Sequence, residues 1–514
     1  MPTLPQDALV LTASQPPSPL IQLGRWITSF PGMLAAILVA KVVWTCRDRI
    51  ADPDLWWHLK NAQYLWTTGH FPNFDSYSFT AAGSPWLNHE WLSELFYYGA
   101  YRALGLQGVF LLFTAVLLVI MLTLFQCALK ASGEPFAAGI VTVGGGLLAM
   151  VGFSPRTQLF GWLCFLGIYV ILLRLRAGRR APLWLVPVLF CVWINCHGSW
   201  PLGLAVYAIV VGCGLLQRDV GHLAAAPWSP PQLRRLVLTG LASLAAMTIT
   251  PFGYRLLAYP FDLLFRQSVG VANVGEWASV DFNDARGHQV LLILALILYL
   301  AFAGRNRWRL DEAALTGLVL FCGLTHIRFL LFAGMVLPPL LVGQLGRLSS
   351  YNPQHERRLI NSVFVAGAAA FVFFGYPTES MLQGQNAALF PVDCIQFLKA
   401  HPQPGRIFNS FDMGGFLEWN LPQVPVFIDS RSDIFDYKGV LRDYLAITGA
   451  IHSQELLDRY AVSYVVYPKD TPLAYLLVSN GRWEGIYEGG QSIILRRQRA
   501  PLSETVPAAG KSGP

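Results

Sequence analysis

The sequence predicts a polytopic α-helical membrane protein with about eleven transmembrane helices and a small C-terminal extracytoplasmic α/β domain. Of the 514 residues, 54% are hydrophobic and only 13% are charged, and the mean hydropathy is +0.44. These values lie outside the range of soluble globular proteins. Runs of about 18 or more mostly apolar residues recur through most of the chain, as in transmembrane helices. The first run lies between a polar tail and charged residues, which argues against a cleavable signal peptide.

The predicted helices follow an N-terminal tail, residues 1–25, that is rich in Pro, Ser and Gln and is expected to be disordered. Together the helices form a predicted transmembrane domain over residues 26–377. Two stretches inside it, 48–106 and 251–287, are too long to be simple connections and are expected to lie along the membrane surface. The helices are expected at 28–46, 108–129, 136–152, 158–174, 182–196, 200–216, 233–250, 288–303, 312–326, 329–346 and 359–376.

Basic residues concentrate in alternate short loops, which indicates the orientation of the chain. Loops rich in Lys and Arg stay in the cytoplasm, so the N-terminus is expected there. With eleven spans, the surface stretches and the C-terminal domain lie outside, at the periplasmic face of a bacterial inner membrane. The net charge of +7 comes largely from these basic loops and is explained by the orientation of the chain in the membrane, so no nucleic-acid partner is expected. The basic set is Lys130, Arg174, Arg176, Arg179, Arg180, Arg218, Arg234, Arg235, Arg305, Arg307, Arg309, Arg347, Arg357 and Arg358.

The C-terminal part changes character, and residues 378–498 are expected to form the α/β domain, followed by a disordered end at 499–514. Short β-rich runs alternate with helical patterns, as in small α/β domains. Strands are expected at 406–409, 425–429, 462–467 and 492–495, and helices at 387–400, 437–460 and 472–480. The Gly414-Gly415 pair has no third glycine and no following Lys-Ser/Thr, so a nucleotide-binding loop is not indicated.

The stretch Asp52-Pro-Asp-Leu-Trp-Trp-His-Leu59 is the first candidate site. A carboxylate at the membrane interface can act as a general base on a hydroxyl. Asp52 and Asp54 could also hold a divalent cation, Mg or Mn, through oxygen ligands. Alternatively, Asp54 caps a helix over 55–66. His58 lies one helical turn after Asp54 and adds a second titratable group on the same helix face.

Further ionisable residues fall at the same predicted outer boundary, where they are costly and often functional. Arg156 and Arg328 could bind a lipid phosphate or diphosphate through the planar donor fork of arginine. Alternatively, each could extend to the interface as an ordinary surface residue. After the predicted strand at 425–429, the Ile428–Asp433 segment suggests ligand contacts or, equally, an Asp–Arg ion pair. The remaining substrate-binding candidates are His89, Glu90, His197, Glu276 and His326.

One stretch resembles a known family. The run Asp54-Leu-Trp-Trp-His-Leu-Lys-Asn-Ala-Gln-Tyr-Leu-Trp-Thr-Thr-Gly69 is followed by Phe-Pro, Ser-Pro-Trp86 and His-Glu-Trp91. It resembles the first outer loop of GT-C glycosyltransferases, which use polyprenyl-phosphate sugars and include protein mannosyltransferases and aminoarabinose lipid A transferases. Asp54 falls at the family's catalytic aspartate, but Leu55 stands where the family has Glu. The closer resemblance, which covers nearly the whole chain, is to a group of uncharacterised bacterial membrane proteins that look like distant members of this superfamily, but it indicates no substrate.

The resemblance implies a GT-C-like fold and transfer of a sugar from a polyprenyl-phosphate donor to a glycan, lipid or protein acceptor. Asp54, assisted by Asp52 or His58, would deprotonate the acceptor. Arg328 and Arg156 would hold the phosphate, while His89, Glu90 and His197 would line the acceptor side. No cofactor other than a possible cation at Asp52 and Asp54 is expected. The alternatives are a transporter or flippase, which would place polar residues near the bilayer midplane, and an inactive scaffold of the same fold.

Overall fold

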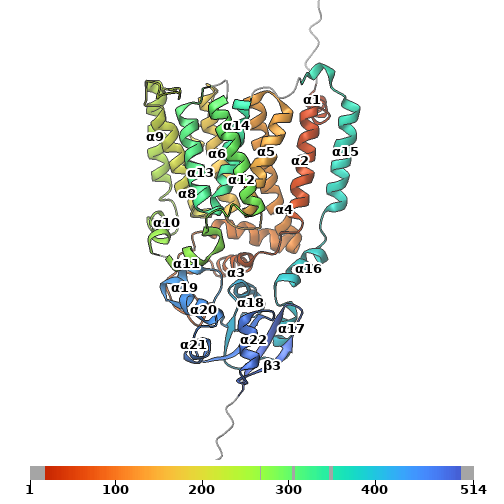
Figure 1. Ribbon diagram of the computed structural model, residues 1–514, viewed down its shortest axis with the longest axis vertical. Helices are drawn as coiled ribbons and strands as arrows, with labels where there is room; N and C mark the ends of the chain where they lie inside the picture. Colours follow the sequence, from red (N-terminus) through yellow and green to blue (C-terminus); the bar gives the residue numbers. More distant parts are fainter. Residues whose placement is uncertain (1–17, 267, 304–306, 346–350, 499–514) are drawn as a thin grey trace, which may run out of the picture.

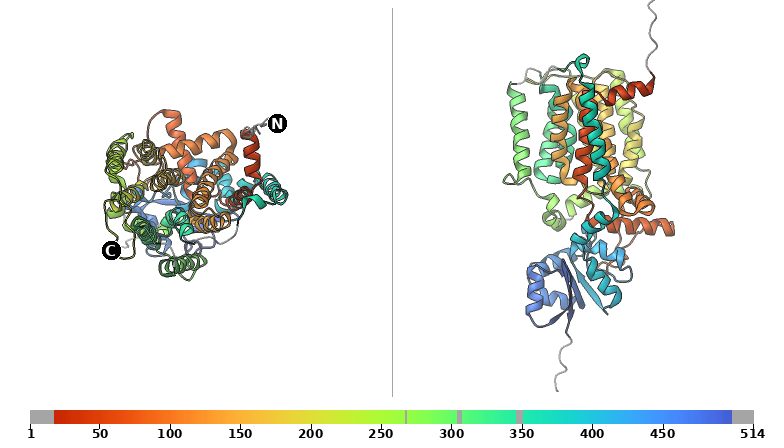
Figure 2. Two further views of the ribbon diagram at one scale, coloured as in Figure 1. Left: turned by 90° about the horizontal axis from the view of Figure 1, so that it is seen from above. Right: turned by 90° about the vertical axis from the view of Figure 1, so that its right-hand side faces the viewer.

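The computed structural model describes residues 18–266, 268–303, 307–345 and 351–498. A bundle of helices forms one part and a small α/β domain is stacked on one end of it (Figure 1, Figure 2). Most of the N-terminal tail expected to be disordered and the whole C-terminal end at 499–514 lie outside the described residues. Within the tail, the disorder prediction is wrong for α1 (Pro19–Ile27), which Ser18 caps at its N-terminus.

Every predicted membrane helix overlaps a helix of the bundle. Among the described residues, six helices are long and apolar enough to cross a membrane, and α1 with α2, bent by 69°, adds a seventh. The count of eleven crossings therefore stays a prediction. The helices are α2 (Phe30–Cys46), α4 (Trp91–Ser132), α5 (Pro135–Ala149), α6 (Gln158–Arg176), α7 (Leu185–Cys196), α8 (Trp200–Cys213), α9 (Pro230–Ala246), α12 (Ala285–Ala303), α13 (Leu310–Thr325), α14 (Leu330–Leu345) and α15 (Arg358–Gly375).

Small residues set how closely the bundle packs. Gly145 of α5 and Gly334 of α14 face each other, and a Cβ on either would collide with the carbonyl oxygen of the other. Such close backbone approach is typical of helix contacts in membranes. In α4 the helix breaks at Leu104 and Gly105, where Gly105 has a φ of 61°. A left-handed backbone there suits glycine, and it lets the first part of α4 lie along the bundle end before the second part enters the bundle.

The end of the bundle that carries the α/β domain is covered by surface helices. They are α3 (Pro53–Thr68), the first part of α4, α10 (Arg255–Arg266) and α11 (Ser268–Asn273) (Figure 1). These helices occupy the two stretches predicted to lie along the membrane surface. Short 3₁₀ turns, η2 (Gly275–Trp277) and η3 (Ile327–Phe329), lie at the same end.

The α/β domain contains a four-stranded sheet of order β1-β2-β4-β3, in which only β1 and β2 are parallel. The strand expected at 425–429 is wrong, because that segment makes a single bridge from Val426 to Ser78 and does not join the sheet. The strand β3 was not predicted. The elements of the α/β domain are α16 (Glu379–Leu389), α17 (Val392–Ala400), β1 (Arg406–Asn409), α18 (Gly414–Asn420), α19 (Ser432–Tyr437), α20 (Val440–Thr448), α21 (Ser453–Arg459), β2 (Val462–Pro468), α22 (Pro472–Ser479), β3 (Trp483–Glu488) and β4 (Ser492–Arg497).

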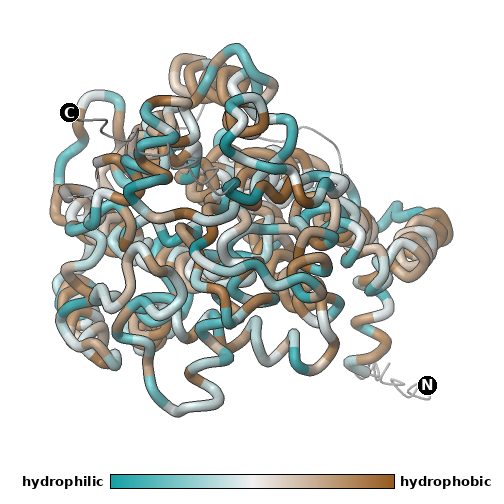
Figure 3. Tube along the Cα trace, turned by 90° about the horizontal axis from the view of Figure 1, so that it is seen from below, coloured by the Kyte–Doolittle hydropathy of each residue, from teal (hydrophilic) through white to brown (hydrophobic). Residues whose placement is uncertain are grey.

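Several contacts fasten the α/β domain to the first surface stretch, among them a backbone pairing and a close helix approach. The backbone of Val426 exchanges hydrogen bonds with Tyr77 and Phe79 at 3.0 and 3.1 Å. Gly415 lets α18 approach α3, because a Cβ there would lie 3.1 Å from the Trp57 amide nitrogen. The glycine pair thus serves close packing. Seen from the α/β side, many of the loops of this domain are hydrophilic (Figure 3). The boundary near residue 378 stays a prediction.

Candidate functional site

A cavity of about 690 Å³ lies between the end of the bundle and the α/β domain. Its walls come from α3, the segment before α4, the turns at 156–158 and 197–202, α10, η2, η3 and two loops of the α/β domain. The structure therefore brings the outer-boundary candidates together on one cavity. Nine of the predicted site residues line it, namely Asp54, His58, His89, Glu90, Arg156, His197, Glu276, His326 and Arg328.

Asp52 has a different position. One carboxylate oxygen accepts a hydrogen bond from the Asp54 amide at 2.9 Å, so Asp52 is the N-cap of α3 and Pro53 begins the helix. The other oxygen accepts a hydrogen bond from Arg156 Nε at 2.8 Å. With 4% of its side chain exposed, Asp52 does not reach the cavity. The expectation that Asp54 caps this helix is wrong.

Asp54 is consequently free to face the cavity, where 24% of its side chain is exposed. One carboxylate oxygen lies 3.4 Å from Arg156 Nε, and the other accepts a hydrogen bond from the Trp57 indole at 3.4 Å. The indole also donates to Ser430 of the α/β domain at 2.9 Å. These contacts fix the direction of the carboxylate. An anchored, partly exposed carboxylate is the geometry that a general base requires.

Arg156 lies on the cavity wall and joins three acids, two of which, Asp54 and Glu276, also line the cavity. Its guanidinium pairs with Asp52, Asp54 and Glu276. The guanidinium of Arg156 occupies the position between Asp52 and Asp54 that a metal cation shared by them would need. Among the described residues, no group of three or more His, Cys, Asp or Glu is arranged to hold a metal ion. The residues present therefore do not fit the metal site that the acid pair suggested.

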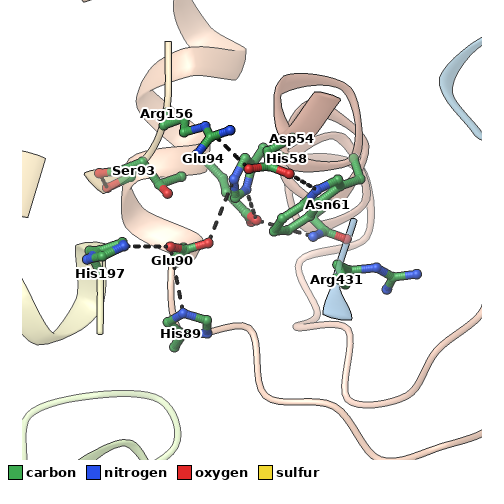
Figure 4. Close-up of polar contacts among 12 residues, drawn as sticks. Asp54, His58, Asn61, His89, Glu90, Ser93, Glu94, Arg156, His197 and Arg431 are labelled. Atoms are coloured by element: carbon green, nitrogen blue, oxygen red, sulfur yellow. Dashed lines mark hydrogen bonds and ion pairs between the residues drawn. The ribbon is translucent and has the colours of Figure 1, made fainter. Parts of the chain in front are cut away.

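Glu90 lies at the centre of a cluster of histidines (Figure 4). One of its oxygens is 3.6 Å from His89 Nε2 and 3.5 Å from His197 Nε2, and the other is 3.7 Å from His58 Nε2. Burial raises the pKa of Glu90, although the charge of His58 opposes the rise. Burial lowers the pKa of His89 to about 4, so this ring is neutral at physiological pH. The cluster therefore places a carboxyl group beside at least one neutral imidazole ring.

Sequence reasoning missed Glu94, which is buried behind this cluster. It accepts hydrogen bonds from His58 Nδ1 at 2.9 Å, Asn61 at 3.2 Å and Asn88 at 2.6 Å. Its signal in the sequence was its place one helical turn after Glu90 at the start of a helix. An acid so close to an apolar span is costly unless it is paired.

Arg328 also lines the cavity, and it has no hydrogen bond or ion pair within the described part of the chain. Its guanidinium lies 4.5 Å above the Trp277 ring. His326 donates a hydrogen bond from Nδ1 to the Trp277 carbonyl at 2.6 Å, which ties η2 to η3. The free donor fork of Arg328 faces the cavity and is suited to a phosphate.

The α/β domain closes the cavity with Asp412, Ser430 and Asp433. Asp433 accepts a hydrogen bond from the Tyr259 hydroxyl at 3.3 Å, and burial raises the pKa of this carboxyl group. Next to these residues, Arg431 binds Asp429 at 2.5 Å and Asp75 at 2.7 Å, with 1% of its side chain exposed. The sequence suggested either an Asp–Arg ion pair or ligand contacts for the Ile428–Asp433 segment. The ion pair is present, and Asp433 lines the cavity beside it.

The fold and the cavity together define a polytopic membrane protein with a polar site at one end of its helical bundle. No protein-family model and no curated protein matches the chain. Solved structures do match it. ArnT from Cupriavidus metallidurans bound to undecaprenyl phosphate superposes with a TM-score of 0.53 at 14% identity, covering 90% of this chain and 97% of that one.

Two other solved structures have the same architecture. The Archaeoglobus fulgidus oligosaccharyltransferase gives a TM-score of 0.50 at 12% identity, over 84% of this chain and 69% of that chain. Arabinofuranosyltransferase AftD from Mycobacteria gives 0.50 at 14% identity, over 91% of this chain but only 40% of that one. The chain therefore has the GT-C fold, and the resemblance drawn from its first surface stretch is confirmed at the level of the fold.

Proposed function

We propose that this protein is a membrane glycosyltransferase that moves a sugar from a polyprenyl-phosphate donor to an acceptor hydroxyl. One observation carries the proposal: an anchored carboxylate, Asp54, and an unpaired guanidinium, Arg328, line the same cavity at the bundle end. The reaction needs a base for the acceptor and a cation for the departing phosphate. The GT-C fold, shared with a structure that holds undecaprenyl phosphate, supports this choice of donor.

In the proposed reaction Asp54 accepts the proton of the acceptor hydroxyl as its oxygen attacks the anomeric carbon. The bond from that carbon to the phosphate oxygen breaks, and polyprenyl phosphate leaves with the electron pair. Arg328 binds the developing charge of the phosphate, a stabilisation that is strong where water is excluded. Arg156 is already engaged by three acids, so we assign it the positioning of Asp54 in place of phosphate binding.

Glu90, His89 and His197 are proposed to contact the acceptor. They lie on the wall formed by the segment before α4 and the turn after α7. Glu276 and His326 hold η2 and η3 in place beside the proposed phosphate position. We further propose that the cavity faces the outside of a bacterial inner membrane. In support, the described basic loops, such as those after α4, α6 and α8, lie at the end of the bundle away from the α/β domain (Figure 1), as the positive-inside rule requires of a cytoplasmic face.

The depth of the cavity favours transfer over transport. Among the cavity-lining residues of α6, α13 and α14, those farthest along each helix from the cavity end are Trp162, Phe321 and Phe332, and they still lie within the first or last five residues of their helices. Transporter sites lie near the middle of the bilayer and open in turn to both sides.

The test is Asp54→Asn in cells that carry no other copy of the protein. Loss of a general base lowers the rate by roughly 10²- to 10⁴-fold, so the lipid-linked donor should accumulate as it does in a deletion strain. Asp48→Asn is the matched control, because Asp48 lies on the same segment but does not line the cavity. The assay is mass spectrometry of polyprenyl-phosphate sugars. If cells with the Asp54→Asn protein process the donor at the normal rate, Asp54 is not the base.

A further inference from the structure

Glu94 is a buried carboxylate that the proposed reaction does not use. Only 1% of its side chain is exposed, and it does not line the cavity, so it cannot touch a substrate. Within the described residues its only ion-pair partner is His58, while Asn61 and Asn88 donate neutral hydrogen bonds to it. A carboxylate removed from water in this way is unfavourable unless its partners compensate.

His58 connects Glu94 to the cavity. Because its Nδ1–H donates to Glu94, the ring is held with Nε2 directed at Glu90. Burial lowers the pKa of His58, but the hydrogen bond to Glu94 and the charges of Glu90, Glu94 and Asp54 outweigh burial and raise the pKa above its usual value. Glu94 therefore favours the doubly protonated, cationic ring.

The charge state of Glu90 follows from its surroundings. His89 and His197 face one of its oxygens, and burial lowers the pKa of both rings, so they contribute no charge near neutral pH. The charged groups that face it are the His58 imidazolium from α3, Arg328 from η3 and Asp54, and burial opposes ionisation of Glu90. Of the cations, only His58 lies within 4 Å, at 3.7 Å.

We infer that Glu94 is a positioning residue which, by keeping His58 protonated and oriented, maintains Glu90 as a carboxylate that accepts a hydrogen bond from the acceptor. This inference rests on the proposed function, because it assigns Glu90 to the acceptor side. Glu94, His58 and Glu90 then act in series across the first turn of α4 and the facing turn of α3. The hydroxyl that binds Glu90 is a neighbour, on the acceptor, of the hydroxyl that attacks the anomeric carbon, and Asp54 still takes the proton of the attacking hydroxyl.

The experiment compares Glu94→Gln, which removes the charge, with Glu94→Asp, which keeps it. Glu312→Gln is the control for loss of a partly buried, ion-paired carboxylate, because it lies at the opposite end of the bundle and glutamine preserves the capping box that begins α13. Each full-length protein is titrated by nuclear magnetic resonance with isotopically labelled histidines, and His58 is assigned by its absence in His58→Gln. Sugar transfer is measured in parallel as a function of pH.

In Glu94→Gln the His58 resonance should titrate at lower pH than in the unaltered protein. The acidic limb of the transfer profile should move to higher pH, with a loss of kcat/KM of roughly tenfold or more at neutral pH that is regained at higher pH. Glu94→Asp should restore most of both. A rate reduced equally at every pH, or an unmoved His58 titration, would overturn the inference. If the unaltered protein transfers no sugar but His58 shifts as expected, the proposed function fails while the link from Glu94 to His58 stands.

Discussion

Replacing Arg328 by methionine removes a guanidinium from the cavity wall but keeps a flexible apolar side chain over the ring of Trp277. Because Arg328 has no hydrogen bond or ion pair within the described residues, its removal breaks no structural pair, although it takes away one of the positive charges that face Glu90. The effect on folding should be small, and the effect on ligand binding can be measured alone. This separation makes Arg328 the sharpest test of the proposed phosphate position.

The expected loss follows from the bonds that the guanidinium would make. A hydrogen bond between charged groups contributes about 1.5–3 kcal/mol, so the Kd for undecaprenyl phosphate should rise about 10- to 150-fold. Arg328→Lys keeps the charge but loses the planar fork, and its Kd should lie between the two. Native mass spectrometry of the purified protein, titrated with undecaprenyl phosphate, measures each Kd directly.

Arg102 provides a matched control. Its guanidinium also stacks on a tryptophan, Trp66, at 5.5 Å, but it does not line the cavity. Arg102→Met should bind undecaprenyl phosphate as the unaltered protein does. Equal affinities for Arg328→Met and the unaltered protein would show that the phosphate binds elsewhere.

Two further predictions concern stability. Arg431→Met leaves Asp75 and Asp429 buried without their cation and should lower the free energy of unfolding by about 3–5 kcal/mol. The exposed pair of Arg459 is the control, and Arg459→Met should lower it by less than about 1 kcal/mol. Thermal unfolding measures both variants, and equal midpoints would contradict the first expectation. Burial keeps the pKa of His89 near 4 against 6.5 in an unfolded chain, so between these values the unfolded state binds more protons. The stability that neutral His89 contributes is therefore fully present above about pH 6.5 and is lost as the pH falls to 4, by up to about 3 kcal/mol. In a plot of the unfolding midpoint against pH, His89→Gln should flatten the slope between these two values. An unchanged slope would contradict this prediction.

The meeting of distant residues at one cavity could be predicted because membrane topology restricts where loops lie. Four of these residues are far apart in the chain, but all fall in the set of alternate loops predicted to lie outside the membrane, namely Asp54, Arg156, His197 and Arg328. Alternate loops of a helical bundle share a face, so counting basic residues was enough to group them. The count carries no information on depth or direction, and it therefore could not separate Asp54, which faces the cavity, from Asp52, which caps α3.

Other features depend on pairings that a single sequence does not encode locally. Arg431 and Asp75 are 356 residues apart, and only the docking of the α/β domain on the first surface stretch brings them together. Glu94 was missed because it lies in the predicted surface stretch 48–106, and its partners His58 and Asn61 reach it only when α3 packs against the start of α4. Strand β3 contains Gly485 and exposed polar residues, which weaken the alternating pattern expected of a strand.

The leucine at position 55, where the resemblance expected Glu, can be explained by the geometry of α3. Leu55 is fully buried in the core of the bundle end, so an acid there would point away from the cavity. Asp52 supplies the second carboxylate from the other side of Pro53, where it both begins the helix and binds Arg156. Arg156 in turn contacts Asp54 and Glu276. The second acid of the pair thus anchors the arginine that contacts Asp54, which agrees with the proposal that Asp54 is the base.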